Sequence, residues 1–117
     1  MEIIFLEYPK CTTCKKAKDF LTKNNIVFTQ RHIVEDNPNK EELKKWIKFS
    51  GLPIKRFFNT SGIKYRKLNL KDKFEKLSEE NLLTILESDG MLVKRPLIIS
   101  DKKIIVGFKP DEYEKLL

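Results

Sequence analysis

Residues 8–21 read YPKCTTCKKAKDFL, and this stretch holds both cysteines of the 117-residue chain, Cys11 and Cys14. Before it lies the apolar run at residues 3–6, which is typical of a strand buried on both faces of a sheet. Behind the cysteines, apolar residues recur at helical spacing with lysines between them, which predicts a helix from residue 11 or 12 to about residue 24. The cysteine pair is therefore expected where the first strand passes into the first helix.

The elements outside this stretch predict the rest of the sheet. A strand over residues 26–33 completes a β–α–β unit, whose right-handed crossover makes its two strands parallel. Residues 96–99 and 104–106, joined by a four-residue turn, form a hairpin, and Pro110 opens a last short helix. This order predicts an α/β fold with a four-stranded mixed sheet, a thioredoxin-like core of the glutaredoxin type.

The middle of the chain, about residues 36–92, is predicted to be a mainly helical insertion. We expect one domain over residues 1–117, with a core formed by about residues 1–35 and 93–117. The insertion is expected to hold a helix that Asn39 caps with Glu42 in a capping box and that ends near residues 50–51, a short helix over residues 54–58, a polar loop over residues 59–62, and a helix that Ser78 caps and that ends at Asp89-Gly90.

Composition and charge limit the function classes. Net charge is +7, but 20 of the 24 basic residues are lysines, interleaved with acidic residues along the chain. This favours a solvated surface over direct, sequence-specific DNA binding, because arginine is the usual reader of bases. No apolar run approaches the roughly 20 residues that span a bilayer, and residues 1–9 lack the basic segment of a signal peptide. We expect a monomeric cytoplasmic protein with reduced thiols and no membrane contact.

The position of the cysteine pair suggests redox chemistry. Free N–H groups and the helix dipole at the start of the helix, with Lys10, Lys15 and Lys16 nearby, should lower the pKa of Cys11 below the free value of about 8.5. Cys11 is thus the expected nucleophile, and Cys14 is the thiol that resolves a mixed disulfide. The alternatives are two unreactive cysteines or a zinc site.

A zinc site has little support, because structural zinc takes four Cys or His ligands and the chain offers only His32 besides the pair. We therefore expect no metal, and we interpret His32 as a strand residue. Arg95-Pro96 leaves two interpretations open. Pro96 starts a strand in the ordinary way, or it is cis beside the cysteine loop, with Arg95 close enough to the thiolate to bind an oxyanion.

Four segments together resemble one known family, the arsenate reductase (ArsC) and Spx proteins. They are YPKCTTCKKAKDFL (residues 8–21), GLPIKRFFNTSG (51–62), LESDGMLVKRPLII (86–99) and VGFKPDEYEKLL (106–117), and the resemblance covers nearly the whole chain. It implies a thioredoxin-like fold with a helical insertion, Pro96 as a cis proline and Cys11 as the nucleophile.

The resemblance also implies an oxyanion site. The family's arsenate reductases hold arsenate with three arginines. Arg95 matches one, Asn59 and Lys109 stand where the other two align, and Glu7 stands where those enzymes have a histidine. Two bidentate groups are thus lost and a carboxylate is gained near the anion.

The resemblance leaves two main functions. One is a cytosolic ArsC-like thiol–disulfide oxidoreductase with arsenate as a candidate substrate, no bound cofactor, and glutathione with glutaredoxin, or thioredoxin, as electron donor. The other is an Spx-like redox-sensing regulator that binds the C-terminal domain of the RNA polymerase α subunit, since the Cys11–Cys14 pair is the Spx arrangement. Residues 51–62 are closer to the enzyme-like branch. An adaptor that keeps the fold without the chemistry is a third interpretation.

Overall fold

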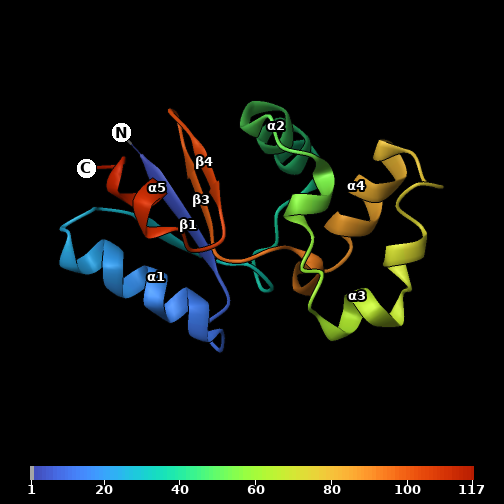
Figure 1. The fold of residues 1–117 in the computed structure, drawn as a ribbon, viewed down its shortest axis with the longest axis horizontal. Helices are drawn as coiled ribbons and strands as arrows, with labels where there is room; N and C mark the ends of the chain where they lie inside the picture. Colours follow the sequence, from blue (N-terminus) through green and yellow to red (C-terminus); the bar gives the residue numbers. More distant parts are fainter. Residues whose placement is uncertain (1) are drawn as a thin grey trace. The chain divides into compact units, whose positions relative to one another are not determined.

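The structure is a computed structural model that describes residues 2–117, shown as a ribbon in Figure 1. The chain divides into two compact units. The first unit holds the described residues up to His32 together with Arg95–Leu117, and the second holds Ile33–Lys94. Both cysteines belong to the first unit.

A four-stranded mixed sheet is the centre of the first unit. Its strands are β1 (Ile3–Glu7), β2 (Thr29–His32), β3 (Leu97–Ser100) and β4 (Ile104–Val106), in the order β2-β1-β3-β4. β1 pairs with β2 in parallel, whereas β1–β3 and β3–β4 are antiparallel. The predicted mixed sheet and thioredoxin-like fold class are confirmed.

Two helices, α1 (Thr12–Lys23) and α5 (Pro110–Glu114), lie on the same side of the sheet in Figure 1. Their apolar side chains share one buried cluster with residues of the strands: Ile3, Phe5, Ala17, Leu21, Ile98, Ile105, Tyr113 and Leu116. The Tyr113 hydroxyl is also satisfied, because it donates a hydrogen bond to the Gly107 carbonyl at 3.1 Å. Burial of this cluster stabilises the face of the sheet that carries α1.

The second strand is shorter than the sequence predicts. We expected a strand over residues 26–33, but β2 covers only Thr29–His32. Ile26 and Phe28 are partly buried against the α1 cluster from the loop that precedes the strand. Apolar residues at alternate positions thus meet the core without joining the ladder, a case that alternation alone does not distinguish from a strand.

The second unit is helical, as predicted. Its elements are α2 (Lys40–Ser50), η1 (Ile54–Phe57), α3 (Ile63–Lys67), η2 (Leu70–Asp72), α4 (Glu79–Glu87) and η3 (Gly90–Leu92). The capping box of α2 is present: the Glu42 N–H donates to Asn39 Oδ1 at 2.8 Å, and the Asn39 N–H donates to Glu42 Oε1 at 3.1 Å. Gly51 ends α2 in the left-handed conformation, with φ of 71°.

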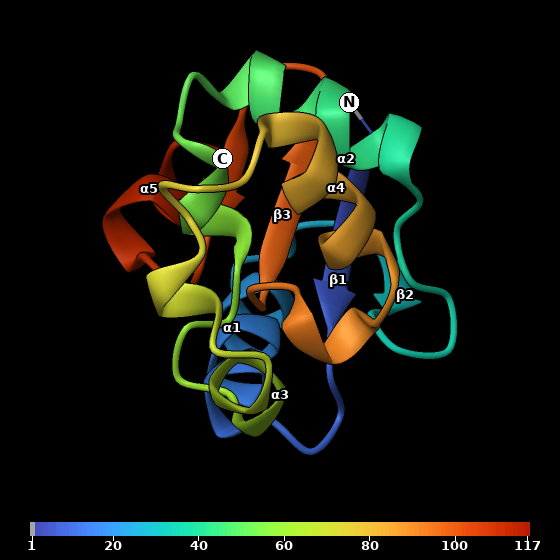
Figure 2. The ribbon, with the colours of Figure 1, turned by 90° about the vertical axis from the view of Figure 1, so that its right-hand side faces the viewer.

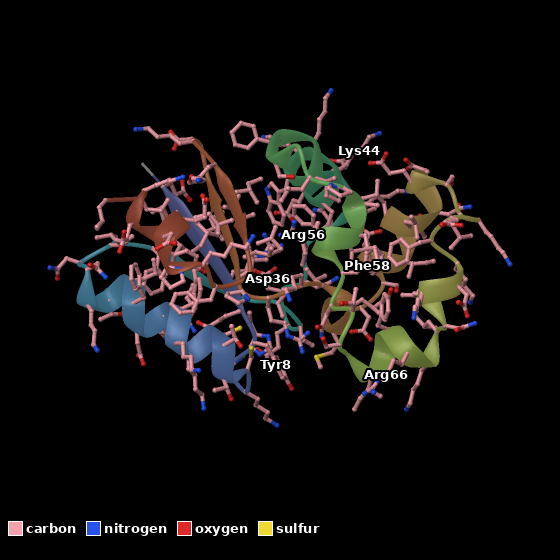
Figure 3. All side chains as sticks on the ribbon, viewed as in Figure 1. Tyr8, Asp36, Lys44, Arg56, Phe58 and Arg66 are labelled. Atoms are coloured by element: carbon pink, nitrogen blue, oxygen red, sulfur yellow. The ribbon has the colours of Figure 1, made fainter. Side chains whose placement is uncertain are left out.

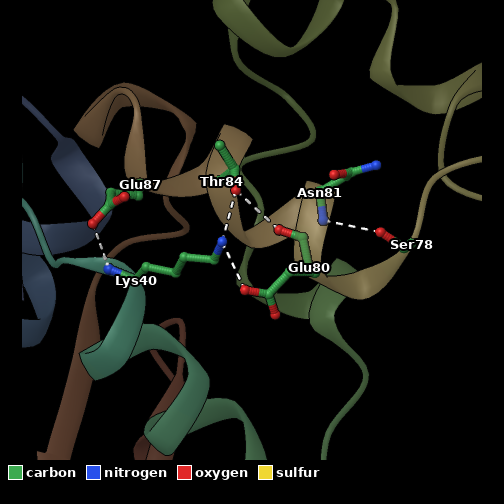
Figure 4. Close-up of polar contacts among 6 residues, drawn as sticks. All are labelled: Lys40, Ser78, Glu80, Asn81, Thr84 and Glu87. Carbon is green, nitrogen blue, oxygen red and sulfur yellow. Dashed lines mark hydrogen bonds and ion pairs between the residues drawn. The ribbon is translucent and has the colours of Figure 1, made fainter.

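Helices α2 and α4 lie side by side, as Figure 2 shows, and one lysine joins their ends. Lys40 Nζ lies 2.7 Å from Glu80 Oε1 and donates to Thr84 Oγ1 at 2.9 Å (Figure 4). The Lys40 backbone N–H donates to Glu87 Oε2 at 2.7 Å. The first turn of α2 is therefore held against both ends of α4.

Two features of this unit differ from the prediction. The helix after Ser78 ends at Glu87 with Ser88 as its cap, so Gly90 does not end it. Gly90 instead starts η3 and packs on a backbone: a Cβ added there would lie 2.0 Å from the Ile33 carbonyl oxygen. The helix α3 was not predicted. Its buried Tyr65 packs in an aromatic cluster with Phe74 and with Phe58, which Figure 3 labels.

Within residues 2–117, no helix is long and apolar enough to cross a membrane.

Candidate functional site

Cys11 is the N-cap residue of α1. Its backbone is extended, with φ of −90° and ψ of 121°, and its sulfur accepts a hydrogen bond from the Cys14 N–H at 3.3 Å. The Cys11 N–H in turn donates to the Tyr8 carbonyl at 2.9 Å, which closes the loop after β1. The first turn of α1 contains no acidic residue. Cys11 thus takes the place of a polar capping side chain, and its half-buried sulfur lies at the positive end of the helix dipole.

Cys14 lies one turn further along α1 and is fully buried. Burial raises the pKa of its thiol from the usual value near 9.0 to about 12. Within that net shift, a hydrogen bond with the Tyr8 backbone lowers the pKa, whereas the Cys11 thiol and the Glu7 carboxylate raise it. The two thiols interact with each other, and neither forms a disulfide here.

Tyr8 links the cysteine loop to Arg95. The Arg95 guanidinium carbon lies 5.2 Å from the centre of the Tyr8 ring, a cation–π contact. The Tyr8 ring also contacts His32, edge to face at 5.9 Å between centroids. His32 is a strand residue, as interpreted from the sequence, and it ends β2. Tyr8 is labelled in Figure 3, beside the start of α1.

Pro96 leads directly into β3. The Arg95–Pro96 peptide bond is cis, and the Pro96 carbonyl accepts a hydrogen bond from the Gly107 N–H at 2.8 Å. Of the two interpretations that the sequence left open, the structure has the cis form. Pro96 itself is buried, and the side chain of the preceding Arg95 contacts the Tyr8 ring.

Glu7, the last residue of β1, is a buried acid at the edge of this site. It is only 3% exposed, and its Oε2 accepts no hydrogen bond from any group among residues 2–117. Lys18 of α1 forms an ion pair with it, but the Lys18 Nζ lies 3.9 Å from that oxygen, too far for a hydrogen bond. Lys18 donates instead to Gln30 Oε1 at 3.0 Å. A buried carboxylate with an unsatisfied oxygen is costly, so its place beside the cysteine loop calls for a reason.

The other two predicted anion ligands, Lys109 and Asn59, lie in different units of the chain. Lys109 is exposed and stands as the N-cap of α5 without a side-chain capping bond. Asn59 belongs to the second unit, where its N–H donates to the Leu92 carbonyl at 2.7 Å. Roles for Arg95, Lys109 and Asn59 in oxyanion binding stay predictions. Residues 2–117 contain no cluster of His, Cys, Asp or Glu that could hold a metal ion.

The site therefore combines an accessible thiol with a buried one. Cys11 is reachable from solvent and is bonded by an N–H group, whereas Cys14 is buried behind it and protonated at neutral pH. An outer thiol can attack a substrate, and an inner thiol one helical turn away can displace the product from the outer sulfur. The arrangement is suited to forming and breaking a disulfide within one turn.

Sequence reasoning missed two contributors to this site, Glu7 and Tyr8. Glu7 was noted only as a departure from the histidine of the resembling enzymes. The alternation of β1 could have found it, because Ile3, Phe5 and Glu7 share one face of the strand. Tyr8 acts through its backbone and its ring, and no pattern of residue types predicts such contacts.

Comparison with known sequences finds one family. The ArsC family profile matches residues 6–116. The uncharacterized protein YusI of Bacillus subtilis is 51% identical over 115 residues, which cover 98% of each chain. The regulatory protein MgsR of Bacillus subtilis is 31% identical over 115 residues, 98% of this chain and 90% of that one.

Solved structures give the same result. A Bacteroides fragilis protein described as ArsC family related has a TM-score of 0.97 at 53% identity, covering 100% of this chain and 98% of that one. An arsenate reductase from Vibrio cholerae has a TM-score of 0.88 at 24% identity, covering 100% and 98%. This second similarity concerns the fold alone.

Proposed function

The chain belongs to the ArsC family, and from that premise we propose that it is a cytosolic thiol–disulfide oxidoreductase with Cys11 as nucleophile and Cys14 as resolving thiol. One observation supports this above the others. The Cys11 sulfur caps α1 and accepts the Cys14 N–H, with the Cys14 thiol directly behind it. A thiolate at that position is stabilised by the amide and by the helix dipole.

The reaction has two steps. The Cys11 thiolate attacks one sulfur of a substrate disulfide, which forms a mixed disulfide and releases the first product as a thiolate. Cys14 then loses its proton and attacks the Cys11 sulfur, which releases the second product and leaves a Cys11–Cys14 disulfide. The enzyme is oxidised by two electrons and the substrate is reduced by two. A dithiol donor, such as thioredoxin, or glutathione with glutaredoxin, restores the thiols.

Arsenate is a second candidate substrate for the same nucleophile. Arg95, next to Tyr8 of the cysteine loop, supplies one guanidinium for an oxyanion, and Lys109 and Asn59 are the further proposed ligands. Against it stands Glu7, since a buried carboxylate near the site opposes an anion. We therefore place disulfides ahead of arsenate.

A stoichiometric reaction with an aromatic disulfide tests the two cysteine roles. The reduced protein is mixed with dithionitrobenzoate, and the released thionitrobenzoate is followed by absorbance. We expect two equivalents per wild-type chain, one from Cys14→Ser, and no fast release from Cys11→Ser. Release of a single equivalent by wild type, or fast release from Cys11→Ser, would overturn the assignment.

The substrate and donor are tested by comparing wild type with Cys14→Ser. Arsenate turnover and insulin disulfide reduction are measured with glutathione and glutaredoxin, and separately with thioredoxin. Disulfide reduction that requires Cys14 supports the proposal. Arsenate turnover with glutathione that survives Cys14→Ser would show instead that arsenate is the substrate and that glutathione resolves the intermediate.

A redox-responsive regulator is the alternative, because MgsR is named a regulatory protein and is 31% identical along 98% of this chain. In that case the Cys11–Cys14 disulfide is a switch, and the partner is the C-terminal domain of the RNA polymerase α subunit. Titration calorimetry of reduced and oxidised protein with that domain tests it. Binding in one redox state favours the regulator, and absence of binding in both removes it.

A further inference from the structure

Glu7 is a buried acid that has no role in the two-step reaction described above. The carboxylate is 4% exposed at its side chain, and one oxygen has no hydrogen-bond partner within residues 2–117. Its ion pair with Lys18 is loose, at 3.9 Å. Taking a carboxylate out of water costs several kcal/mol unless its oxygens are well bonded, so the position has no evident benefit for stability.

The alternation of β1 determines which way this side chain faces. Ile3 and Phe5 lie in the cluster with Ala17 and Leu21 of α1, and Glu7 is on the same face of the strand. Because only four residues separate β1 from α1, Glu7 lies at the level of the first turns of that helix.

On the helix side, the residues at this level are Cys14 and Lys18. Cys14 precedes Ala17 by three residues and shares its buried face. The ion pair between Lys18 and Glu7 shows that the end of β1 lies beside this part of α1. The Cys14 sulfur also forms a hydrogen bond with the backbone of Tyr8, the residue after Glu7. The Glu7 charge raises the pKa of Cys14, so the carboxylate lies within electrostatic range of the inner thiol, and both side chains are buried.

We propose that Glu7 is the base that takes the Cys14 proton when Cys14 attacks a mixed disulfide on Cys11. The inference rests on the proposed oxidoreductase function. The proton of the Cys14 thiol passes to the free Glu7 oxygen. The Cys14 sulfur forms a bond with the Cys11 sulfur, the bond from Cys11 to the product sulfur breaks, and the product leaves as a thiolate. When a dithiol reduces the enzyme, Glu7 returns the proton to Cys14.

The need for such a base follows from the burial of Cys14. A buried thiol that stays protonated at neutral pH is a poor nucleophile, and hydroxide cannot easily reach it. The other ionisable groups near Glu7 are poor substitutes. Lys18 is cationic, Cys11 is consumed in the mixed disulfide, and His32, the register partner of Glu7 on β2, packs against the Tyr8 ring beside Arg95.

Electrostatic repulsion by Glu7 and base catalysis by Glu7 predict opposite effects of Glu7→Gln on the rate of Cys14 attack. As a fixed negative charge, Glu7 opposes the Cys14 thiolate, so removing it should speed the attack. As a base, Glu7 makes the thiolate, so removing it should slow the attack. The two steps separate in stopped-flow reaction with dithionitrobenzoate, where the first equivalent reports Cys11 and the second reports Cys14.

We expect Glu7→Gln to release the first equivalent at the wild-type rate and the second about a hundredfold more slowly at neutral pH, a typical loss for a general base. The rate of the second step in Glu7→Gln should rise about tenfold per pH unit, because hydroxide must then take the Cys14 proton, whereas the wild-type rate should depend less steeply on pH. Glu7→Asp, which keeps the carboxylate, should fall between the two.

Asp19→Asn is the matched control, since it removes an exposed carboxylate from α1, the helix that carries Cys14, and it should behave as wild type. A second step in Glu7→Gln that is unchanged or faster than wild type overturns the role of Glu7. Failure of the wild-type protein to release a second equivalent removes the oxidoreductase function itself. Circular dichroism and the rate of the first equivalent verify that Glu7→Gln is folded.

Discussion

At the scale of single residues, the buried Cys14 thiol makes stability depend on pH. Its pKa is raised, mainly by burial, from near 9.0 to about 12. The free energy of unfolding is therefore not reduced by Cys14 below pH 9, where the thiol is protonated in both the folded and the unfolded chain. It falls as pH rises toward 12, because the unfolded chain releases a proton that the folded chain retains.

The prediction is that reduced wild type loses up to about 1.4 kcal/mol of unfolding free energy per pH unit above pH 9, in excess of Cys14→Ala. Urea denaturation at several pH values under reducing conditions measures this. The comparison with Cys14→Ala cancels the lysines and Tyr113, whose pKa burial also raises. Parallel curves for the two proteins would contradict the assignment.

Two glycines offer a contrast in what a methyl group costs. At Gly90, a Cβ would meet the Ile33 carbonyl oxygen at 2.0 Å and Val34 Cα at 2.7 Å, and neither backbone atom can rotate away. Gly51 has a φ of 71° but open space around it. We expect Gly90→Ala to cost more than about 3 kcal/mol and Gly51→Ala about 1–2 kcal/mol. Thermal denaturation compares them, and equal losses would refute the close approach.

Residue identity predicted part of the site and not the rest. Cys11 and Cys14 were predictable because they are the two cysteines of the chain and lie three positions apart at the start of a helix. Arg95-Pro96 was predictable because a charged residue and a proline directly precede a predicted strand. Glu7 did not, because acidic residues are usually exposed and its burial depends on the α1 face that covers it. Tyr8 contributes a backbone contact, which side-chain identity does not encode. Roles for Arg95, Lys109 and Asn59 stay predictions.

At the scale of elements, α2 carries a reciprocal cap that α4 lacks. Asn39 and Glu42 bond each other's N–H groups, whereas at α4 only Ser78 accepts, from the Asn81 N–H. We expect Asn39→Ala to cost about 1 kcal/mol, and the Asn39→Ala, Glu42→Ala pair to cost less than the sum of the single losses. A double-mutant cycle by urea denaturation measures the coupling, and strict additivity would contradict it.

Element boundaries that follow local chemistry were predictable, and those that follow packing were not. The caps at Asn39 and Ser78 and the helix start at Pro110 act within a few residues, and the structure confirms them. The start of β2 depends on Phe28 meeting the α1 cluster, and α3 depends on Tyr65 joining an aromatic group. Such contacts link distant parts of the chain, so a local pattern cannot contain them.

At the scale of the whole molecule, the redox chemistry lies in one of the two units. Both cysteines, Glu7, Tyr8 and Arg95 belong to the unit of residues up to 32 and from 95 onward. We expect oxidation to the Cys11–Cys14 disulfide to change amide hydrogen exchange chiefly in that unit. Exchange mass spectrometry of reduced and oxidised protein tests this, and changes of equal size throughout residues 33–94 would contradict it.

Charge is also divided unevenly along the chain. Residues 44–76 hold 11 of the 24 basic residues but only two of the 17 acidic ones. That segment alone exceeds the net charge of +7, and the rest of the chain is slightly acidic. The interpretation that lysines are interleaved with acidic residues along the whole chain therefore fails for residues 44–76, which lie within the second unit.

The outer strand β2 bears on how the molecule behaves among its own copies. It is only four residues long, reads Thr29-Gln30-Arg31-His32, and has exposed polar residues at its first two positions. An edge strand this short and this polar offers a neighbouring molecule few backbone groups for β-pairing. Crowding at high concentration should therefore not recruit the sheet into fibrils through this side.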